Sequence, residues 1–383
     1  MTRAKLVTFA CALVCAAPAH GQDDQGRPWR LSAEPLLAIG RTDGPPEELF
    51  SRIVGAVRLP DGRYAVADGR ELRITVYDPT GRLLSVFGRE GSGPGEFRSI
   101  YGIWSIGDTL SVWDERLQRI TRFSPAGDVL RTDALRFGPV RPPADAGSLD
   151  PFLGVFSDGR IALGWLAAGR GPPEQLVPDR MVLGLFDAEG TFLKVLGRAE
   201  GLIRIHKPGV GGGPFVFSPF PSAAVSRDRL VFTDGLTDAL VFDPDASSQM
   251  HTRRLPLPGP EISLRDAWRE LEQVLDESNW PKVLLDLARS TDRSIGRVPR
   301  IARMFADDRA RLWLKEYDPS KDAIPVRRGT GGRWRIVDPS GEPIAHIAMP
   351  AHISPLAVYG DHLLAVGRDS LDVERFMAYR IIH

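Results

Sequence analysis

The sequence contains little cysteine, and both cysteines lie near its start. Cys11 and Cys15 belong to residues 1–21, which open with the basic residues Arg3 and Lys5. An apolar run of about a dozen residues and the small-residue stretch AHG follow, as in a secretory signal. That run is too short to cross a bilayer as a helix. We therefore expect a cleaved signal peptide, and an exported domain that uses no disulfide, cysteine metal site or thiol nucleophile.

The chain also lacks an excess of charge of either sign. It has 49 basic and 49 acidic residues. A near-neutral protein has no basic field to attract nucleic acid. We expect a monomer in the periplasm or outside the cell, with no membrane span after cleavage and no nucleic-acid partner.

A short turn pattern recurs along the chain. Two β-forming residues precede Asp or Ser, a turn and usually Gly, a combination that reverses the chain between two strands. The copies are VYDPTG (76–81), RFSPAG (122–127), LFDAEG (185–190), VFDPDA (241–246) and IVDPSG (336–341).

A second pattern of strand, turn and strand precedes the first. Together the two patterns predict an antiparallel unit of four strands, repeated six times. The units are expected to start near Ile53, Ile100, Phe152, Ala223, Arg300 and Ser354. The last unit has only three strands, whereas residues 34–40 (EPLLAIG) resemble an isolated fourth strand. We therefore predict an all-β, six-bladed β-propeller in residues 22–383, closed by this N-terminal strand.

The glycine-rich stretch VFGREGSGPGEF (86–97) is compatible with two interpretations. A phosphate-binding loop would have to open a helix in a βαβ unit. The residues that follow, SIYGIWSIGDTLSVWD (99–114), have strand character instead. We therefore interpret 86–97 as the crossover between the first and second units.

The stretch GREGSGPGEF, a strand pair ending in Trp113-Asp114, and QRITRFSPAGDVL (118–130) resemble an NHL repeat. More particularly, the chain resembles the NHL-like six-bladed propellers that bacteria such as Bacteroidetes and Gemmatimonadetes export. The Asn-Arg-Ile usual in an NHL unit stands here as Leu72-Arg73-Ile74 and Gln118-Arg119-Ile120. The resemblance implies a propeller fold and a binding role.

Three repeated aspartates end the second strands of their units: Asp68, Asp114 and Asp234. They could form a ring of carboxylates on one face. Alternatively, each could accept backbone N–H bonds in its own loop or pair with Arg73 or Arg119. We favour this second interpretation, in which the aspartates stabilise their own loops and do not bind a ligand.

Arginines and aromatic residues are expected to gather on the face that carries the crossovers. Both residue types suit carboxylate, sugar or peptide ligands, although tryptophans in propellers also pack between sheets. The candidate ligand-binding residues are Arg41, Arg70, Arg89, Trp113, Arg116, Trp165, Arg198, Lys315, Tyr317 and Arg368.

Two enzymatic alternatives depend on metal ligands. Calcium-dependent lactonases of the gluconolactonase type, also six-bladed, use Asn among their ligands, but this chain has one asparagine, Asn279, in an expected helix. NHL-like peptide-amidating lyases use several histidines for zinc. His206, His251, His346, His352 and His362 are available, without ligand-like spacing. We expect no catalytic residue, metal or cofactor.

Residues 261–290 interrupt the repeat with helical spacing. Leu264, Trp268 and Leu271 fall on one face, and Ser263 with Asp266 resembles a capping box. Pro281 suits the start of a second helix. This helical hairpin could simply cap the propeller, or it could form a lid over a pocket or a partner-binding surface. The leading functional hypothesis is an exported, non-catalytic protein that binds a peptide, protein or glycan; the rival is a lyase or hydrolase with its site at the central channel.

Overall fold

The computed structural model describes residues 26–137, 139, 142, 144, 148–167, 176–207, 211–218, 220–247, 253–274, 298–323, 331–369 and 371–383. The predicted signal peptide lies outside these residues, as do Asn279 and the second predicted helix of the insertion. The described chain is mostly β-strand, as predicted.

Four sheets are formed by strands that follow one another along the chain. The first contains β3 (Ile53–Arg58), β4 (Tyr64–Asp68), β5 (Arg73–Tyr77) and β6 (Leu83–Phe87). The second contains β7 (Gly102–Ile106), β8 (Thr109–Asp114), β9 (Arg119–Phe123) and β10 (Val129–Ala134). The third contains β11 (Ser148–Val155), β12 (Ile161–Ala167), β13 (Leu176–Phe186), β14 (Phe192–Lys207) and β15 (Gly211–Pro214). The fourth contains β16 (Ser222–Ser226), β17 (Arg229–Thr233), β18 (Ala239–Phe242) and β19 (Arg253–Leu255).

The remaining strands form one nine-stranded sheet. It contains two antiparallel runs. The first run is β20 (Ile301–Ala306), β21 (Leu312–Glu316), β22 (Gly332–Val337) and β23 (Pro343–Met349). The second run is β24 (Ile353–Tyr359), β25 (His362–Arg368) and β26 (Glu374–Ile382). The N-terminal strand β1 (Arg27–Leu31) joins the runs, since it pairs in parallel with β23 and antiparallel with β26. The short strand β2 (Leu37–Ile39) also pairs with β26.

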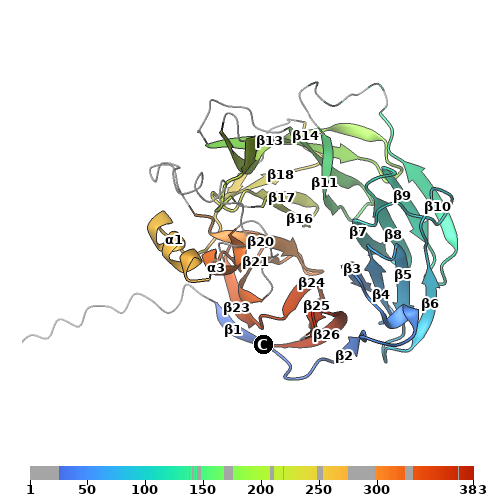
Figure 1. Cartoon of the computed structure of the whole chain (residues 1–383). Coiled ribbons are helices and arrows are strands. Elements are labelled where there is room, and N and C mark those ends of the chain that lie inside the picture. The colour runs from blue at the N-terminus through green and yellow to red at the C-terminus, as the bar shows by residue number, and fades with distance from the viewer. Residues whose placement is uncertain are drawn as a thin grey trace, which may run out of the picture.

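The sheets are arranged as a ring in which each is seen nearly edge-on, which is a propeller-like fold (Figure 1). The first strands β24, β3 and β7 are side by side, as are β11, β16, β20 and β24. Because successive strands are antiparallel, the ring has two ends. The turns from first to second and from third to fourth strands lie at one, here named the turn end. The loops from second to third strands and the crossovers between sheets lie at the other, the crossover end.

Hairpin turns of the Asp-Pro-x-Gly type form where the sequence predicts them. The Asp78 carboxylate accepts hydrogen bonds from the backbone N–H of Thr80 (2.9 Å) and Arg82 (3.0 Å). Gly81 has a φ of +90°, and a Cβ atom there would lie 2.5 Å from the Leu37 side chain. Glycine is therefore required both by the turn conformation and by close packing against the neighbouring strand.

The apolar side chains of the strands pack between neighbouring sheets. One cluster includes Val57 and Ile74 of the first sheet with Leu110 and Phe123 of the second, all nearly inaccessible to solvent. Equivalent clusters lie at the other junctions of the ring. The fold is thus held by face-to-face packing of sheets, with no disulfide needed.

The N-terminal strand β2 pairs with the C-terminal strand β26. Leu37, Ala38 and Ile39 of β2 lie opposite Ala378, Met377 and Phe376 of β26. Ile39 is 8% exposed and packs with Phe376 in one core cluster. Strand β1 adds a second N-terminal pairing with β26 that the repeat pattern did not predict.

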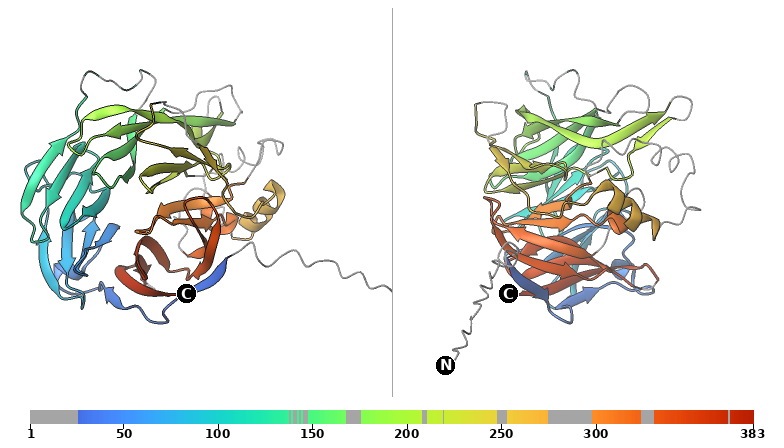
Figure 2. Two further views of the ribbon diagram at one scale, coloured as in Figure 1. Left: turned by 180° about the vertical axis from the view of Figure 1, so that it is seen from behind. Right: turned by 90° about the vertical axis from the view of Figure 1, so that its left-hand side faces the viewer.

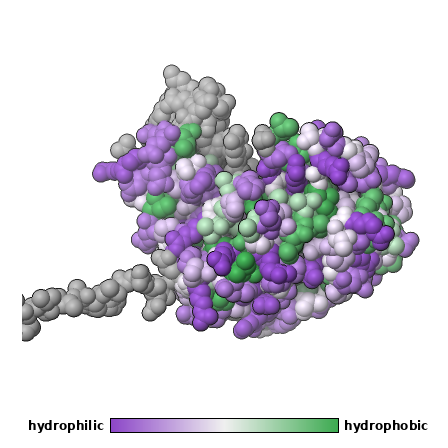
Figure 3. Space-filling view, turned by 90° about the horizontal axis from the view of Figure 1, so that it is seen from below, coloured by the Kyte–Doolittle hydropathy of each residue, from purple (hydrophilic) through white to green (hydrophobic). Residues whose placement is uncertain are grey.

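Apolar residues also occur on the outer strands of the ring. Figure 3 shows the side that lies at the bottom of Figure 1, where apolar side chains gather near the middle among polar ones. Leu36, next to β2, is 44% exposed, and Leu83, Leu84 and Val86 of β6 are 37%, 42% and 44% exposed. These residues border the free edges of their sheets.

Helix α1 (Leu264–Glu272) confirms the first half of the predicted helical insertion. The Ser263 hydroxyl caps it by accepting from the Asp266 N–H (3.1 Å), as the sequence predicts. Leu264, Ala267 and Leu271 are buried against Phe215 and Phe217. Figure 2 shows that α1 lies on the outside of the strands rather than at the centre of the ring. Two shorter helices are η1 (Pro46–Glu48) and α3 (Pro319–Asp322), which follows β21.

The third sheet differs from the expected pattern. It has five strands instead of four, because β14 extends to Lys207 and pairs with β15, Gly211–Pro214. The extension forms because β13 begins early, at Leu176, and its first residues pair with residues 200–205 of β14.

Candidate functional site

The repeated aspartates at the crossover end are loop anchors. Asp68 is 1% exposed, and its carboxylate accepts from the N–H of Ser51 (2.8 Å) and of Arg70 (2.9 Å). Asp114 is fully buried and accepts from the N–H of Arg98 (2.8 Å). Each carboxylate therefore ties its own loop to the incoming crossover, which confirms the structural interpretation of these residues.

Asp234 makes the same kind of contact in the fourth sheet. Its carboxylate accepts from the N–H of Leu236 and of Thr237, both at 2.9 Å. All three aspartates have partners inside the protein, so none is a free carboxylate of a ligand-binding ring.

The arginines of the two NHL-like triplets hold the crossovers instead of pairing with these aspartates. The Arg73 guanidinium donates to the carbonyls of Pro46 (2.5 Å) and Leu49 (2.7 Å). The Arg119 guanidinium donates to the carbonyls of Gly93 (2.7 Å) and Glu96 (2.8 Å). Arginine suits this role because its fork of N–H groups reaches several carbonyls at once.

The residue before each of these arginines is left-handed. Leu72 has a φ of 55° and Gln118 a φ of 47°. Asparagine tolerates this conformation better than most residues. Leu72 and Gln118 therefore hold a backbone conformation that an asparagine would adopt more readily.

Two predicted ligand-binding arginines are paired within their crossovers. Arg41 Nε lies 2.8 Å from a carboxylate oxygen of Glu48, and Arg89 Nη2 lies 2.8 Å from one of Glu96. The arginine side chains remain 66% and 79% exposed. The same seven-residue spacing thus gives each crossover its own surface ion pair, which adds little stability.

The other predicted arginines have different surroundings. Arg368 contacts Asp372 (3.0 Å) and the buried Glu374 (2.6 Å). Arg70 and Arg116 are exposed in equivalent loops after Asp68 and Asp114. Arg198 is also exposed, but it lies inside β14 opposite Val182 rather than in a crossover.

The predicted tryptophans lie in the core. Trp113 and Trp165 are each 3% exposed and belong to one cluster between the second and third sheets. Trp165 makes an edge contact with Phe192, at a centroid distance of 5.3 Å. Both tryptophans therefore pack between sheets, as tryptophans in propellers also do, and neither indole ring has a surface exposed to a ligand.

Lys315 and Tyr317 lie beneath the helical insertion. Lys315 is 2% exposed and pairs with Asp322 of α3 at 2.5 Å, inside the protein. Tyr317 is 4% exposed and packs in the cluster that includes Leu264 and Leu271 of α1. Within the described part of the chain, its hydroxyl has no hydrogen-bond partner. Burial raises the pKa of Tyr317 well above 10, with the Asp322 charge adding to this shift, so the phenol stays neutral.

A pocket of about 420 Å³ lies between the last turn of α1 and the loop that carries α3. Helix α1 contributes Glu270 and Gln273, and the loop after β21 contributes Tyr317 and Asp318. Arg333 of β22 lies on the far side. The pocket is therefore at the crossover end, where the sequence predicts ligand-binding residues, but only Tyr317 of the predicted set lines it.

The lining of this α1 pocket is more acidic than basic. Glu270, Glu316 and Asp318 contribute carboxylates, against one guanidinium from Arg333. Arg333 Nε lies 3.6 Å from Glu316, which also pairs with Arg335 at 2.5 Å. The C-terminal carbonyls of α1 add partial negative charge at the same place.

Sequence reasoning missed Glu270, Gln273 and Arg333 as pocket residues. Glu270 and Gln273 lie on the side of α1 away from its buried residues, and helical spacing in the sequence could have identified that side as exposed. Arg333 had no such signal, because it is one exposed strand residue among many arginines.

Across the described ranges, no group of three or more histidine or acidic side chains is placed to hold a metal ion. His346 lies on β23, His352 before β24 and His362 on β25. The backbone of His206 lies in β14, and His251 lies outside the described residues. In the same part of the chain, no helix is long and apolar enough to cross a membrane.

Comparison with solved structures finds similar propeller-like chains. A member of the DUF4221 family from Bacteroides vulgatus is 11% identical, with a TM-score of 0.45 over 94% of this chain and 100% of that one. A protein of Bacteroides fragilis proposed to be exported is 11% identical, with a TM-score of 0.48 over 93% and 96%. A gluconolactonase from Xanthomonas campestris is 13% identical, with a TM-score of 0.43 over 92% and 100%. No family model and no curated protein sequence matches. The likeness is one of fold alone.

Proposed function

We propose that the ring is a six-bladed propeller of the NHL-like exported type. In support, the first and second runs of the nine-stranded sheet each have the order of one blade, and β1 joins them only at their outer strands. Strand β2 then supplies the fourth strand of the last blade by pairing with β26. The signal-like composition of residues 1–21 supports export to the periplasm or the exterior.

We further propose that the protein is a non-catalytic binding propeller whose ligand occupies the α1 pocket. The observation that supports this most directly is the pocket itself, which α1 forms together with the loop after β21. Its volume of about 420 Å³ falls within the range of small-molecule and side-chain sites. Helix α1 would thus act as one wall of a site rather than as a simple cap.

The charge of the lining favours a peptide or protein ligand with a basic side chain over a neutral glycan. Of the three carboxylates of the lining, Glu316 pairs with Arg335 and Asp318 pairs with Lys321, which leaves Glu270. The C-terminal end of α1 also repels anions. Glu270 is exposed on α1 and is free to meet a lysine or arginine of the ligand. Tyr317 and Ile262 offer apolar surface for the stem of such a side chain.

A pair of tryptophan substitutions tests this site. Gln273→Trp fills the α1 pocket, whereas Glu272→Trp places the same side chain on the same exposed turn but outside the pocket lining. The whole chain, without its signal, is applied to arrays of basic, neutral and acidic peptides and of glycans.

The proposal expects selective binding of basic peptides, reduced at least tenfold by Gln273→Trp and unchanged by Glu272→Trp. If glycans bind selectively and Gln273→Trp blocks that binding, the α1 pocket would remain the proposed site, but its ligand would be a glycan instead of a basic peptide. Binding that Gln273→Trp leaves intact would show that the ligand does not occupy this pocket.

A further inference from the structure

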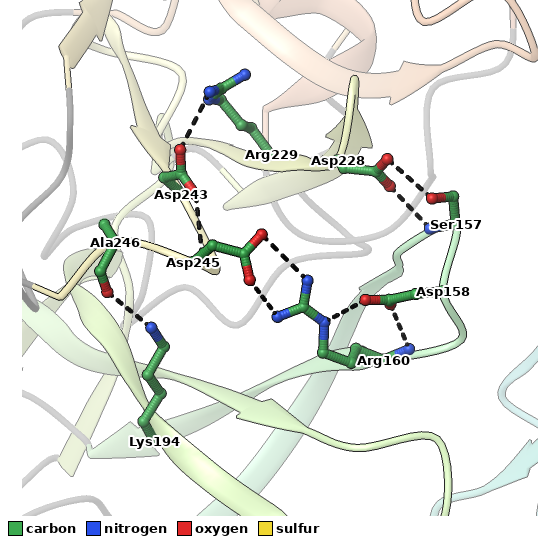
Figure 4. A network of polar contacts seen from close by, with 9 residues as sticks. All are labelled: Ser157, Asp158, Arg160, Lys194, Asp228, Arg229, Asp243, Asp245 and Ala246. Carbon is green, nitrogen blue, oxygen red and sulfur yellow. Dashed lines mark hydrogen bonds and ion pairs between the residues drawn. The ribbon is translucent and has the colours of Figure 1, made fainter.

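The turn end of the ring has a separate set of polar contacts between sheets. The Asp228 carboxylate, in the turn after β16, accepts from the N–H and the hydroxyl of Ser157 in the turn after β11, both at 2.8 Å (Figure 4). Arg160 extends this contact through an ion pair with Asp245 at 2.8 Å. The first-to-second turns of the third and fourth sheets are therefore fastened to each other.

The contacts continue around the ring. The Ser226 hydroxyl donates to the Ala310 carbonyl in the turn after β20 (2.7 Å). The carboxylate of Asp308, in that same turn, accepts from the Gly360 N–H after β24 (2.9 Å). A belt of hydrogen-bonded turns thus runs from the third sheet to the β24–β25 turn.

Next to the β24–β25 turn lies a pocket of about 410 Å³, here named the channel-mouth pocket. It is lined by Tyr359 and His362 around that turn, by Arg58 and Leu59 at the end of β3, and by Ser105 of β7. Asp308 and Asp361 also line it. First strands surround the axis of the ring, so a pocket lined from the ends of three of them lies at the mouth of the central channel.

This pocket and the α1 pocket lie at opposite ends of one strand. Asp308 precedes β21, and Tyr317 follows it. The two sites are therefore separate, and a ligand of one leaves the other open.

The channel-mouth pocket combines an apolar wall with polar groups. Leu59 is fully buried beneath it, and Pro60 and Tyr359 supply further apolar surface. Burial raises the pKa of Tyr359 to about 12, so its hydroxyl is a neutral donor at physiological pH. Such a mixture suits a small ligand with an apolar body and one charged group.

The hydrogen bonds of the lining indicate the sign of that charged group. Both carboxylates already have a polar neighbour: Asp308 accepts from the Gly360 N–H (2.9 Å), and a carboxylate oxygen of Asp361 lies 2.8 Å from His362 Nδ1. The Nε–H of Arg58 is buried and has no hydrogen-bond partner among the described residues. The donor left unsatisfied is thus part of a guanidinium, whose preferred partner is a carboxylate.

We propose that the channel-mouth pocket binds a small organic carboxylate, with its charged end at Arg58 and its apolar body against Leu59, Pro60 and Tyr359. The site is independent of the function proposed for the α1 pocket. It would give the propeller a second ligand at the end of the ring away from the crossovers.

Saturation-transfer NMR on the whole signal-free chain tests this with two probes of opposite charge, benzoate and benzylamine. We expect benzoate to bind with a dissociation constant in the millimolar range or below, and benzylamine to give at least tenfold weaker binding. Arg58→Met should weaken benzoate binding at least tenfold. Arg82→Met is the matched control, since Arg82 is 77% exposed in another turn of the same sheet.

Ser105→Phe provides a second variant in case Arg58→Met does not fold, because it fills the pocket without removing the guanidinium. Loss of benzoate binding in a folded Ser105→Phe protein supports the proposal. Absence of benzoate binding by the natural chain, equal binding of benzylamine, or binding that survives pocket filling would each overturn it.

Discussion

Asp78 shows how single side chains shape the hairpins of this protein. Its carboxylate accepts from the Thr80 hydroxyl and from the N–H of Thr80 and Arg82. These hydrogen bonds, of which that from the Thr80 side chain is the strongest, lower the pKa of Asp78 to about 2. The aspartate therefore stays ionised and keeps the turn closed at any pH that the exported chain is expected to meet.

The hydroxyl groups of two tyrosines, Tyr317 and Tyr77, differ in their hydrogen bonding and can be compared directly. The buried Tyr317 hydroxyl has no partner, whereas the Tyr77 hydroxyl donates to the Glu47 carbonyl at 2.9 Å. An unsatisfied buried polar group is destabilising by about 1–3 kcal/mol, and a satisfied one contributes about 1 kcal/mol. We predict that Tyr317→Phe leaves the free energy of unfolding unchanged or raises it by about 1 kcal/mol, and that Tyr77→Phe lowers it by a similar amount.

Urea unfolding followed by tryptophan fluorescence measures both changes. A loss of stability in Tyr317→Phe as large as that in Tyr77→Phe would mean that the Tyr317 hydroxyl has a partner after all.

At the scale of elements, the loop that carries α3 depends on one buried ion pair. Lys315 of β21 and Asp322 of α3 are almost inaccessible, with side chains 3% and 6% exposed. Removing one member leaves the other charge buried and unpaired, at a cost of about 3–5 kcal/mol. We predict that Lys315→Met destabilises the protein by this amount and that adding Asp322→Asn restores most of it, as measured by urea unfolding.

Asparagine is the suitable second substitution, because its side-chain oxygen can still accept from the Asp318 N–H that Asp322 binds at 2.9 Å. If the double variant were no more stable than the single one, the Lys315–Asp322 pair would not be what holds the α3 loop in place.

The elements also show what the sequence could and could not reveal. Turn residues such as Asp78 and Gly81 act locally, so the hairpins and the capped start of α1 at Ser263 were predictable from pattern alone. The length of β14 was not, because it depends on its pairing with β13. Arg73 and Arg119 were considered as partners of the repeated aspartates, but their guanidinium groups meet backbone carbonyls contributed by crossovers more than twenty residues away. Composition identifies a side chain that can bind, but only tertiary packing decides what it binds.

At the scale of the whole molecule, stability depends on the closure by β2. Ile39 is 8% exposed and packs against the last sheet, whereas Leu36, just before β2, is 44% exposed. Placing a carboxylate at position 39 would bury an unpaired charge at the closing contact. We predict that Ile39→Asp lowers the free energy of unfolding by at least about 3 kcal/mol, and that Leu36→Asp changes it by less than about 0.5 kcal/mol.

Urea unfolding midpoints of the two variants check this prediction. Equal midpoints would show that the ring does not need the pairing between β2 and β26 in order to stay closed.

The pairing of β2 with β26 joins residues 37–39 to residues 376–378, almost the full length of the chain apart. A ribosome makes the first of these segments long before the last. The N-terminal strand therefore has no partner until synthesis is nearly finished, and a chain that crosses a membrane in an extended form would complete its ring only on the far side. The closing contact is therefore among those of greatest sequence separation in the fold, and contacts of this kind form slowly because the entropy of closing a long loop must be lost first.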